Sequence, residues 1–348
     1  MFNHSGLGNK KILIAGGAGF IGHNLSLHLR DLGCEVHVID GLQVNNLGYY
    51  SSIEFENQNS ERYIEFVNER LRLMRAKKVK LHIIDARDYH LVSKVISDIE
   101  PDVVVHAAAV SHANRSNKDP FSTFDHSMRT LENVLDCSRL YKSHLIFFSS
   151  SMVYGDFDND VVGEDRECNP KGIYGALKLG AEKLVIAYGQ VFDLPYTIIR
   201  PSTLYGERCV SRRVGQAFIE NALMGKDLTI NGDGEDALDF TYIDDFVQGV
   251  TKCIGNEKAI GEIFNITFGG SRKLNDLAAL VSSEFPGINV IHQERDSLMP
   301  ERGTLDISKA QELLGFQPLN PIEVGFKRYM KWYRKFEAAY PNLFHNIV

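Results

Sequence analysis

The chain has 348 residues, of which 44% are hydrophobic and 24% charged, and its formal net charge is −7 at neutral pH. This composition is typical of a globular protein with one large and one smaller domain, and the acidic balance gives no overall reason to expect nucleic acid or an anionic membrane as a partner. No apolar stretch approaches the ~20 residues that span a bilayer, and the first residues lack the pattern of a signal peptide.

The first predicted elements are a strand, a glycine-rich turn and a helix. The apolar run at 11–15 predicts a buried parallel strand, and apolar residues recur at helical spacing over 21–32. The turn between them reads Gly16-Gly17-Ala18-Gly19-Phe20-Ile21-Gly22. Glycines at 16, 19 and 22 let backbone N–H groups approach a pyrophosphate, which the start of the following helix also favours. The sequence therefore predicts a dinucleotide site at this turn.

An acidic residue follows the next predicted strand. The strand covers 35–39 and ends in Asp40. A carboxylate at this place accepts hydrogen bonds from a ribose 2′-hydroxyl and repels a 2′-phosphate. We therefore expect the cofactor to be NAD rather than NADP.

The alternation of predicted strands and helices is interrupted between Asp40 and Lys80 and then continues. A basic helix is predicted over Ser60 to Lys78, and we expect it to present a solvated face on an insertion; the alternative is a lid or a subunit contact. Further strands are predicted at 80–84, 102–106, 144–148 and 196–200. The expected fold is α/β: a doubly wound parallel-sheet Rossmann domain over 1–200.

Residues 201–348 predict a smaller, mixed α/β lobe that binds the substrate. Short strands at 228–230 and 263–266 are mixed with helices at 214–224, 243–254 and 274–284. We expect the segment near 240–260 to pack back onto the large sheet. The substrate then lies in the cleft between the lobes, beyond the carboxyl ends of the strands.

Candidate catalytic residues lie around the strand at 144–148. Three serines follow it, and Tyr174 and Lys178 are four residues apart on a helix that begins after Pro170. An ammonium beside a phenol favours the phenolate, so we expect Lys178 to lower the pKa of Tyr174 from ~10 toward neutrality. Tyr174 is then a general base, and a serine hydroxyl binds the substrate oxygen.

These motifs resemble the extended short-chain dehydrogenases and, within them, the NAD-dependent epimerase/dehydratases that act on nucleotide sugars. The resemblance covers roughly residues 10–330. It rests on the glycine turn, Val153-Tyr154-Gly155, Tyr174-xxx-Lys178, Arg200-Pro201-xxx-Tyr205-Gly206, Asn231-Gly232-Asp233-Gly234, Asp239-Phe240-Thr241-Tyr242-Ile243-Asp244-Asp245, and Asp306-Ile307-Ser308-Lys309-Ala310 through Leu313-Leu314-Gly315-Phe316.

The resemblance implies roles for individual residues. Ser150 holds the substrate hydroxyl, Tyr174 is the base and Lys178 holds the nicotinamide ribose. The expected cofactor contacts are Gly16, Gly19, Phe20, Ile21, Gly22, Asp40, Asp85, Ala86, Ala107, Ala108, Tyr174 and Lys178. Ser151 and Thr203 are expected near the substrate with Ser150. A family arginine is replaced by Leu238, so Arg208, Arg212, Arg213 and Arg302 are candidates to supply positive charge for the nucleotide, and Arg208, Arg213 and Arg302 are the expected substrate contacts. Another family position, usually Asn, holds His126.

The branch of the family follows from two positions after Ser150. Sugar 4,6-dehydratases have Asp and Glu there, whereas this chain has Ser151 and Met152. We therefore expect a nucleotide-sugar epimerase, acting at C4 through a keto-sugar intermediate. The alternatives are a C4 dehydrogenase or reductase, a 4,6-dehydratase, and a binding protein without turnover.

Two remaining expectations concern environment and assembly. The five cysteines form no CxxC pair and the twelve histidines no HxxxH, so we expect a cytoplasmic protein without a metal ion. The resemblance implies a homodimer through helices 121–141 and 170–191. Its expected apolar partners are Leu131, Val134 and Leu135 beside Leu184, Val185 and Tyr188, with packing against the sheet as the alternative.

Overall fold

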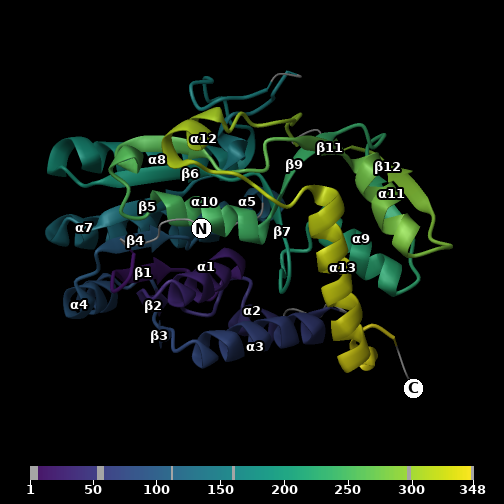
Figure 1. The fold of residues 1–348 in the computed structure, drawn as a ribbon, viewed down its shortest axis with the longest axis horizontal. Helices are drawn as coiled ribbons and strands as arrows, with labels where there is room; N and C mark the ends of the chain where they lie inside the picture. The colour runs from purple at the N-terminus through teal and green to yellow at the C-terminus, as the bar shows by residue number, and fades with distance from the viewer. Residues whose placement is uncertain (1–6, 53–58, 111–112, 159–160, 296–298, 346–348) are drawn as a thin grey trace.

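A computed structural model describes residues 7–52, 59–110, 113–158, 161–295 and 299–345. Its centre is a seven-stranded sheet in which every neighbouring pair is parallel, in the order β10-β6-β5-β4-β1-β2-β3 (Figure 1). The strands are β1 (Lys11–Ala15), β2 (Glu35–Ile39), β3 (Lys80–His82), β4 (Val103–His106), β5 (His144–Phe148), β6 (Tyr196–Arg200) and β10 (Glu262–Asn265).

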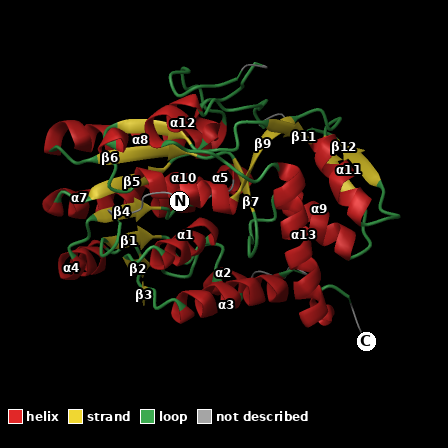
Figure 2. Cartoon of the chain, viewed as in Figure 1, coloured by secondary structure: helices red, strands yellow, loops and turns green. Residues whose placement is uncertain are grey.

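Helices cover both faces of this sheet, because the strands are apolar on both sides (Figure 2). Residues such as Ile12 and Ile14 face α1 (Phe20–Asp31) and α10 (Ile243–Cys253), whereas their neighbour Leu13 faces the other layer. That layer contains α4 (Tyr89–Ile99), α7 (Thr130–Tyr141) and α8 (Gly172–Phe192). The arrangement confirms the predicted doubly wound fold class.

The apolar residues named above for the dimer lie mostly inside the monomer. Leu131, Val134, Leu135 and Val185 are fully buried in the core between α7, α8 and the sheet. They were therefore misassigned to a subunit contact, since their side chains fill the layer beneath the two helices.

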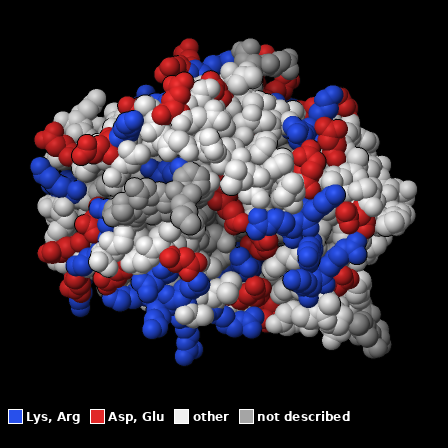
Figure 3. All heavy atoms as spheres, viewed as in Figure 1, with Lys and Arg blue, Asp and Glu red and all other residues white. Residues whose placement is uncertain are grey.

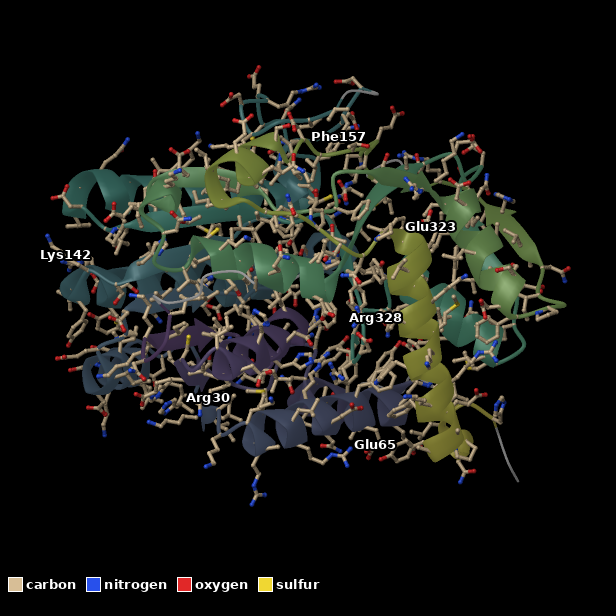
Figure 4. The ribbon with its side chains drawn as sticks, viewed as in Figure 1. Arg30, Glu65, Lys142, Phe157, Glu323 and Arg328 are labelled. Carbon is tan, nitrogen blue, oxygen red and sulfur yellow. The ribbon has the colours of Figure 1, made fainter. Side chains whose placement is uncertain are left out.

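A smaller lobe carries most of the chain after residue 200. It has a mixed sheet in the order β11-β9-β7 and a parallel pair of β8 and β12. Its elements are β7 (Thr203–Tyr205), α9 (Val214–Leu223), β8 (Leu228–Asn231), β9 (Ala237–Tyr242), β11 (Ser271–Lys273), α11 (Leu274–Glu284), β12 (Val290–Gln293), α12 (Ser308–Leu314) and α13 (Ile322–Ala339). Between them the chain returns to the large sheet, where α10 packs on it and β10 pairs with β6. An ion pair of 3.0 Å between Arg328 (Figure 4) and Asp244 joins α13 to α10.

The insertion after β2 contains α2 (Leu47–Tyr50) and the long helix α3 (Ser60–Ala76). Helix α3 runs along the lower edge of the molecule to the end of α13 (Figure 1), where Phe66 meets Phe336 with ring centroids 4.7 Å apart. Figure 3 shows basic side chains gathered at this lower edge. The expectation of a solvated basic face is correct for its exposed cations such as Arg72, but Arg62 and Arg70 are fully buried. The prediction was wrong for these two because their neighbours lie far away in sequence.

The connection from β4 to α7 is irregular. Helices α5 (Ala113–Lys118) and α6 (Pro120–Phe124) lead into a π-helical turn at Asp125–Arg129, which continues into α7. Such turns are frequent at functional sites. None of the helices in the described ranges is both long enough and apolar enough to span a membrane.

Candidate active site

A cleft lies at the carboxyl ends of the central strands, where a doubly wound sheet binds its ligands. Every residue predicted to contact the cofactor lines it, namely Gly16, Gly19, Phe20, Ile21, Gly22, Asp40, Asp85, Ala86, Ala107, Ala108, Tyr174 and Lys178. Ser150 and Arg213 line the same cleft. One concave site therefore brings the glycine turn together with all three predicted catalytic side chains.

The glycine turn has the space and the free donors that a diphosphate needs. Gly16 has a positive φ of 78°, and a Cβ on it would lie 2.6 Å from the backbone nitrogen of Ala108. Gly19 caps α1 without any side-chain hydrogen bond, so the first N–H groups of that helix are not capped by a side chain. Both features fit a dinucleotide whose pyrophosphate lies at the start of α1.

Asp40, which is predicted to bind the ribose, is fixed beside the glycine turn. Its carboxylate accepts hydrogen bonds from the backbone nitrogens of Ala18 at 2.9 Å and Leu42 at 2.8 Å. Burial raises the pKa of Asp40, while these two bonds and the nearby Arg70 oppose the rise. Each carboxylate oxygen has capacity for a second hydrogen bond, so a ribose diol can still be bound.

Asp85, which is predicted to contact the adenine, belongs to an ion-pair chain. Arg87 contacts Asp85 at 2.6 Å and Asp125, in the π-helical turn, at 2.7 Å. The Arg87 guanidinium lowers the pKa of Asp85. Asn133 of α7 donates to the carbonyl of Ala86 at 3.0 Å, so Ala86 is held from α7, whereas Asp85 is held by Arg87.

Ser150 and Tyr174 are joined in the cleft. A hydrogen bond from the Ser150 side chain, the charge of Arg213 and the charge of Arg302 all favour the Tyr174 phenolate, yet burial is the larger effect and raises the Tyr174 pKa above its ordinary value. The expected lowering by Lys178 is therefore not found. The positive charges that oppose burial are the two arginines of the smaller lobe.

Lys178 is turned toward the sheet. Its ammonium donates to the carbonyl oxygen of Phe148 at 2.6 Å and lies 5.0 Å from the ring centroid of Phe147. Burial lowers the pKa of Lys178 to about 8, and the charge of Glu182 opposes this. The ammonium is thus fixed beside the end of β5, from which Ser149 and Ser150 continue.

A buried network behind the catalytic side chains was missed in the sequence. Glu182 accepts from the hydroxyl of Ser149 and from Arg200, whose Nε and Nη2 lie 2.9 and 2.7 Å from its two oxygens. Arg200 also donates to the Tyr154 hydroxyl at 2.9 Å. The spacing could have revealed Glu182, because it follows Lys178 by four residues on the same helix face.

Three residues that were predicted to bind the substrate, Ser151, Thr203 and Arg302, do not line the cleft. Arg302 donates to the hydroxyls of Ser151 and Ser202, the latter at 2.7 Å, and its Nε has no hydrogen-bond partner among the described residues. Burial lowers the pKa of Arg302 to about 10. Thr203 is buried on β7, beside a small pocket that it shares with Arg213.

Arg208 does not reach the cleft lining. Its guanidinium donates to His23 and Asn24 of α1, at 3.1 and 3.3 Å, and lies 3.4 Å from Glu69 of α3. Arg208 was predicted to contact the substrate because Leu238 replaces an arginine of the family and another positive charge was expected near the nucleotide. The structure gives its side chain partners on two helices instead.

His126, at the position where the resemblance implies Asn, is part of the cleft wall. His126 lines the cleft with Thr130, and the Thr130 hydroxyl donates to the His126 carbonyl at 2.9 Å. Over the described part of the chain, no group of three or more His, Cys, Asp or Glu side chains is arranged to hold a metal ion.

Comparisons with known proteins agree with this geometry. The model of the NAD dependent epimerase/dehydratase family matches residues 12–267. An uncharacterized UDP-glucose epimerase of Bacillus subtilis is 31% identical, over 90% of this chain and 95% of the relative. A putative UDP-glucose 4-epimerase of Methanocaldococcus jannaschii is 30% identical, over 92% of this chain and 97% of the relative.

A solved structure extends the agreement to three dimensions. The UDP-glucuronic acid 4-epimerase of Bacillus cereus, in complex with UDP-glucuronic acid and NAD, superposes with a TM-score of 0.83 at 27% identity, over 94% of this chain and 99% of the other. The predicted family is therefore confirmed: the chain belongs to the NAD-dependent epimerase/dehydratase family.

Proposed function

We propose that this enzyme is an NAD-dependent nucleotide-sugar epimerase that inverts C4 of the sugar through a keto intermediate. The observation that carries the proposal is the cleft in which the Ser150–Tyr174 pair and Lys178 share one lining with the glycine turn and Asp40. The relatives described above act on UDP-sugars by name, which supports UDP as the nucleotide.

Tyr174 takes the proton of the C4 hydroxyl while Ser150 holds the same oxygen by a hydrogen bond. NAD held in the cleft would supply the hydride acceptor for C4 and, in the reverse direction, the hydride donor. Once the keto sugar presents its other face, Tyr174 gives the proton back to the oxygen. The proton and the hydride both return, so the net redox change is zero. Lys178, whose ammonium is fixed beside the end of β5, holds the nicotinamide ribose.

The residues after Ser150 favour epimerisation over dehydration. Loss of water from a sugar needs an acid and a base near C5 and C6. The two positions at which the resemblance implies these groups in dehydratases hold Ser151 and Met152, both buried. Neither a thioether nor an alcohol already bonded to Arg302 supplies that chemistry. The substrate therefore keeps its C6 substituent.

We assign the anionic part of the substrate to the two arginines of the smaller lobe. Arg213 lines the cleft and Arg302 lies beside it with an unused Nε. A guanidinium is well suited to diphosphate oxygens because its donors form a fixed fork. Ser151 and Thr203 are buried and do not line the cleft, so we assign no sugar contact to them.

The test is to incubate the purified enzyme with UDP-glucose or UDP-glucuronic acid and follow the C4 configuration by proton NMR. We expect a mixture of C4 epimers without NADH accumulation at 340 nm. Stoichiometric NADH would instead identify a dehydrogenase, and a 4-keto-6-deoxy product would identify a dehydratase.

The homodimer and the cytoplasmic location are also proposals. The apolar side chains of Phe121, Leu140 and Val191 are exposed by 85%, 59% and 68% on α6, α7 and α8. They extend over the helices 121–141 and 170–191, so a second copy would cover them. Five free cysteines fit a reducing compartment. Light scattering would test the dimer, and a monomeric mass would refute it.

A further inference from the structure

Two segments far apart in sequence meet across the cofactor cleft. Gln43, Val44 and Asn45 begin the insertion, while Val210 and Ser211 follow β7. All five line the cleft that also contains the glycine turn and Asp40. A dinucleotide lying on that turn would therefore have the insertion and the loop 206–213 as walls.

Hydrogen bonds join these two walls directly. The hydroxyl of Tyr50 in α2 donates to the carbonyl of Val210 at 2.9 Å. Arg70 of α3 donates to the carbonyl of Arg208 through Nε, at 3.1 Å, and through Nη2. We call these contacts, Tyr50 to Val210 and Arg70 to Arg208, the latch.

The latch also reaches the glycine turn. The Nη1 of Arg70 lies 3.4 Å from the carbonyl oxygen of Ala18, and Asn46 donates to the same oxygen at 3.3 Å. Arg208 donates in the other direction to His23 and Asn24 of α1. The insertion, the loop 206–213 and the turn are thus one connected unit.

Arg70 differs from the other buried arginine of α3. Arg62 has the carboxylate of Glu220 at 3.6 Å, whereas the acceptors of Arg70 are the two backbone carbonyls just named. The nearby Asp40 carboxylate interacts with Arg70 only through its charge, and a buried guanidinium that makes no direct ion pair is costly. The loop it holds has left-handed backbone at Arg208 and Arg212, with φ of 63° and 46°, a conformation that persists only where surrounding contacts impose it.

We propose that Tyr50, Arg70 and Arg208 are positioning residues that keep NAD in place between turnovers by closing the insertion onto the loop 206–213. The inference rests on the proposed function, since an epimerase regenerates its cofactor in each cycle whereas a dehydrogenase must exchange it. Release of the dinucleotide then requires the latch to open.

The test measures cofactor exchange and not activity. The NAD-loaded enzyme is mixed with excess isotope-labelled NAD, and the bound label is followed with time by mass spectrometry. Tyr50→Phe should speed exchange roughly fivefold, the effect of one lost hydrogen bond, and Arg70→Lys about tenfold or more. Arg208→Met should act in the same direction.

The matched control is Tyr63→Phe. It removes a buried hydroxyl from the same insertion, but that hydroxyl donates to Glu220 at 2.9 Å and not to a backbone carbonyl of the loop 206–213. The melting temperature of each variant shows that it is folded. The latch is refuted if folded Tyr50→Phe and Arg70→Lys exchange NAD no faster than Tyr63→Phe. Faster exchange without any epimerisation by the wild type would keep the latch and refute the proposed function.

Discussion

The buried pair of Glu182 and Arg200 gives the sharpest test of how the site is supported. Their side chains are only 1% and 4% exposed. Glu182→Gln keeps the shape but leaves the Arg200 charge without its partner, and breaking a buried pair in this way costs about 3–5 kcal/mol. The glutamine oxygen still accepts one hydrogen bond, so we expect a loss near the lower limit, about 3 kcal/mol of the free energy of unfolding.

The same substitution should change catalysis through Lys178. Glu182 opposes the lowering of the Lys178 pKa by burial, so removing its charge moves this pKa further below about 8. The ammonium is then lost at a lower pH, and the alkaline decline of kcat should begin earlier in the variant. A purely structural role for Glu182 would leave the pH profile unchanged.

Urea denaturation and the pH dependence of kcat measure both effects. The control is Glu323→Gln, which removes one partner of an exposed pair with Arg272, 54% and 39% exposed (Figure 4); a surface pair of this kind contributes less than about 1 kcal/mol. A double variant, Glu182→Leu with Arg200→Met, should cost less than the two single changes added together. Equal stability of Glu182→Gln and Glu323→Gln would refute the reasoning.

Three further predictions use other parts of the site and core. Tyr174→Phe should fold, retain NAD and lose at least ~10²-fold in kcat; near-normal turnover would remove Tyr174 from the mechanism. Asp40→Ala should reduce the preference for NAD over NADP in binding titrations, and an unchanged ratio of Kd values would show that another group sets it. Burial lowers the pKa values of His106 to about 3 and His144 to about 4. Because both lie below the unfolded value near 6.5, the unfolded chain binds more protons and stability should fall as pH drops from 6.5 toward 4. His144→Gln should flatten that slope in urea titrations at several pH values, and an identical slope would contradict the assignment.

The sequence predicted what depends on local pattern. Alternating strands and helices, the glycine turn and the spacing of Tyr174 and Lys178 are short-range signals, and each places its residues in the cleft. A local pattern could not predict which charged groups change the pKa of Tyr174. Lys178 is turned to the carbonyl of Phe148, and the arginines that favour the Tyr174 phenolate come from the other lobe.

The sequence pattern also did not predict which charged residues are buried. A helix with six basic residues in nineteen positions suggests a solvated surface, but Arg70 is enclosed by a loop from residues 206–213 and by the glycine turn. Arg208 was likewise predicted to supply positive charge near the nucleotide, but its side chain contacts α1 and α3. Both outcomes depend on contacts between segments that no local pattern connects.

The contact between α3 and the end of α13 has a consequence for biosynthesis. Arg62 donates to the carbonyl of Leu343, which lies 281 residues later in the chain, and Phe66 packs on Trp332 and Phe336. A nascent chain therefore exposes the aromatic side of α3 until residues 322–343 have left the ribosome, a period in which chaperones can bind it. Fragments that stop before residue 322 keep this surface permanently uncovered and should aggregate when expressed alone.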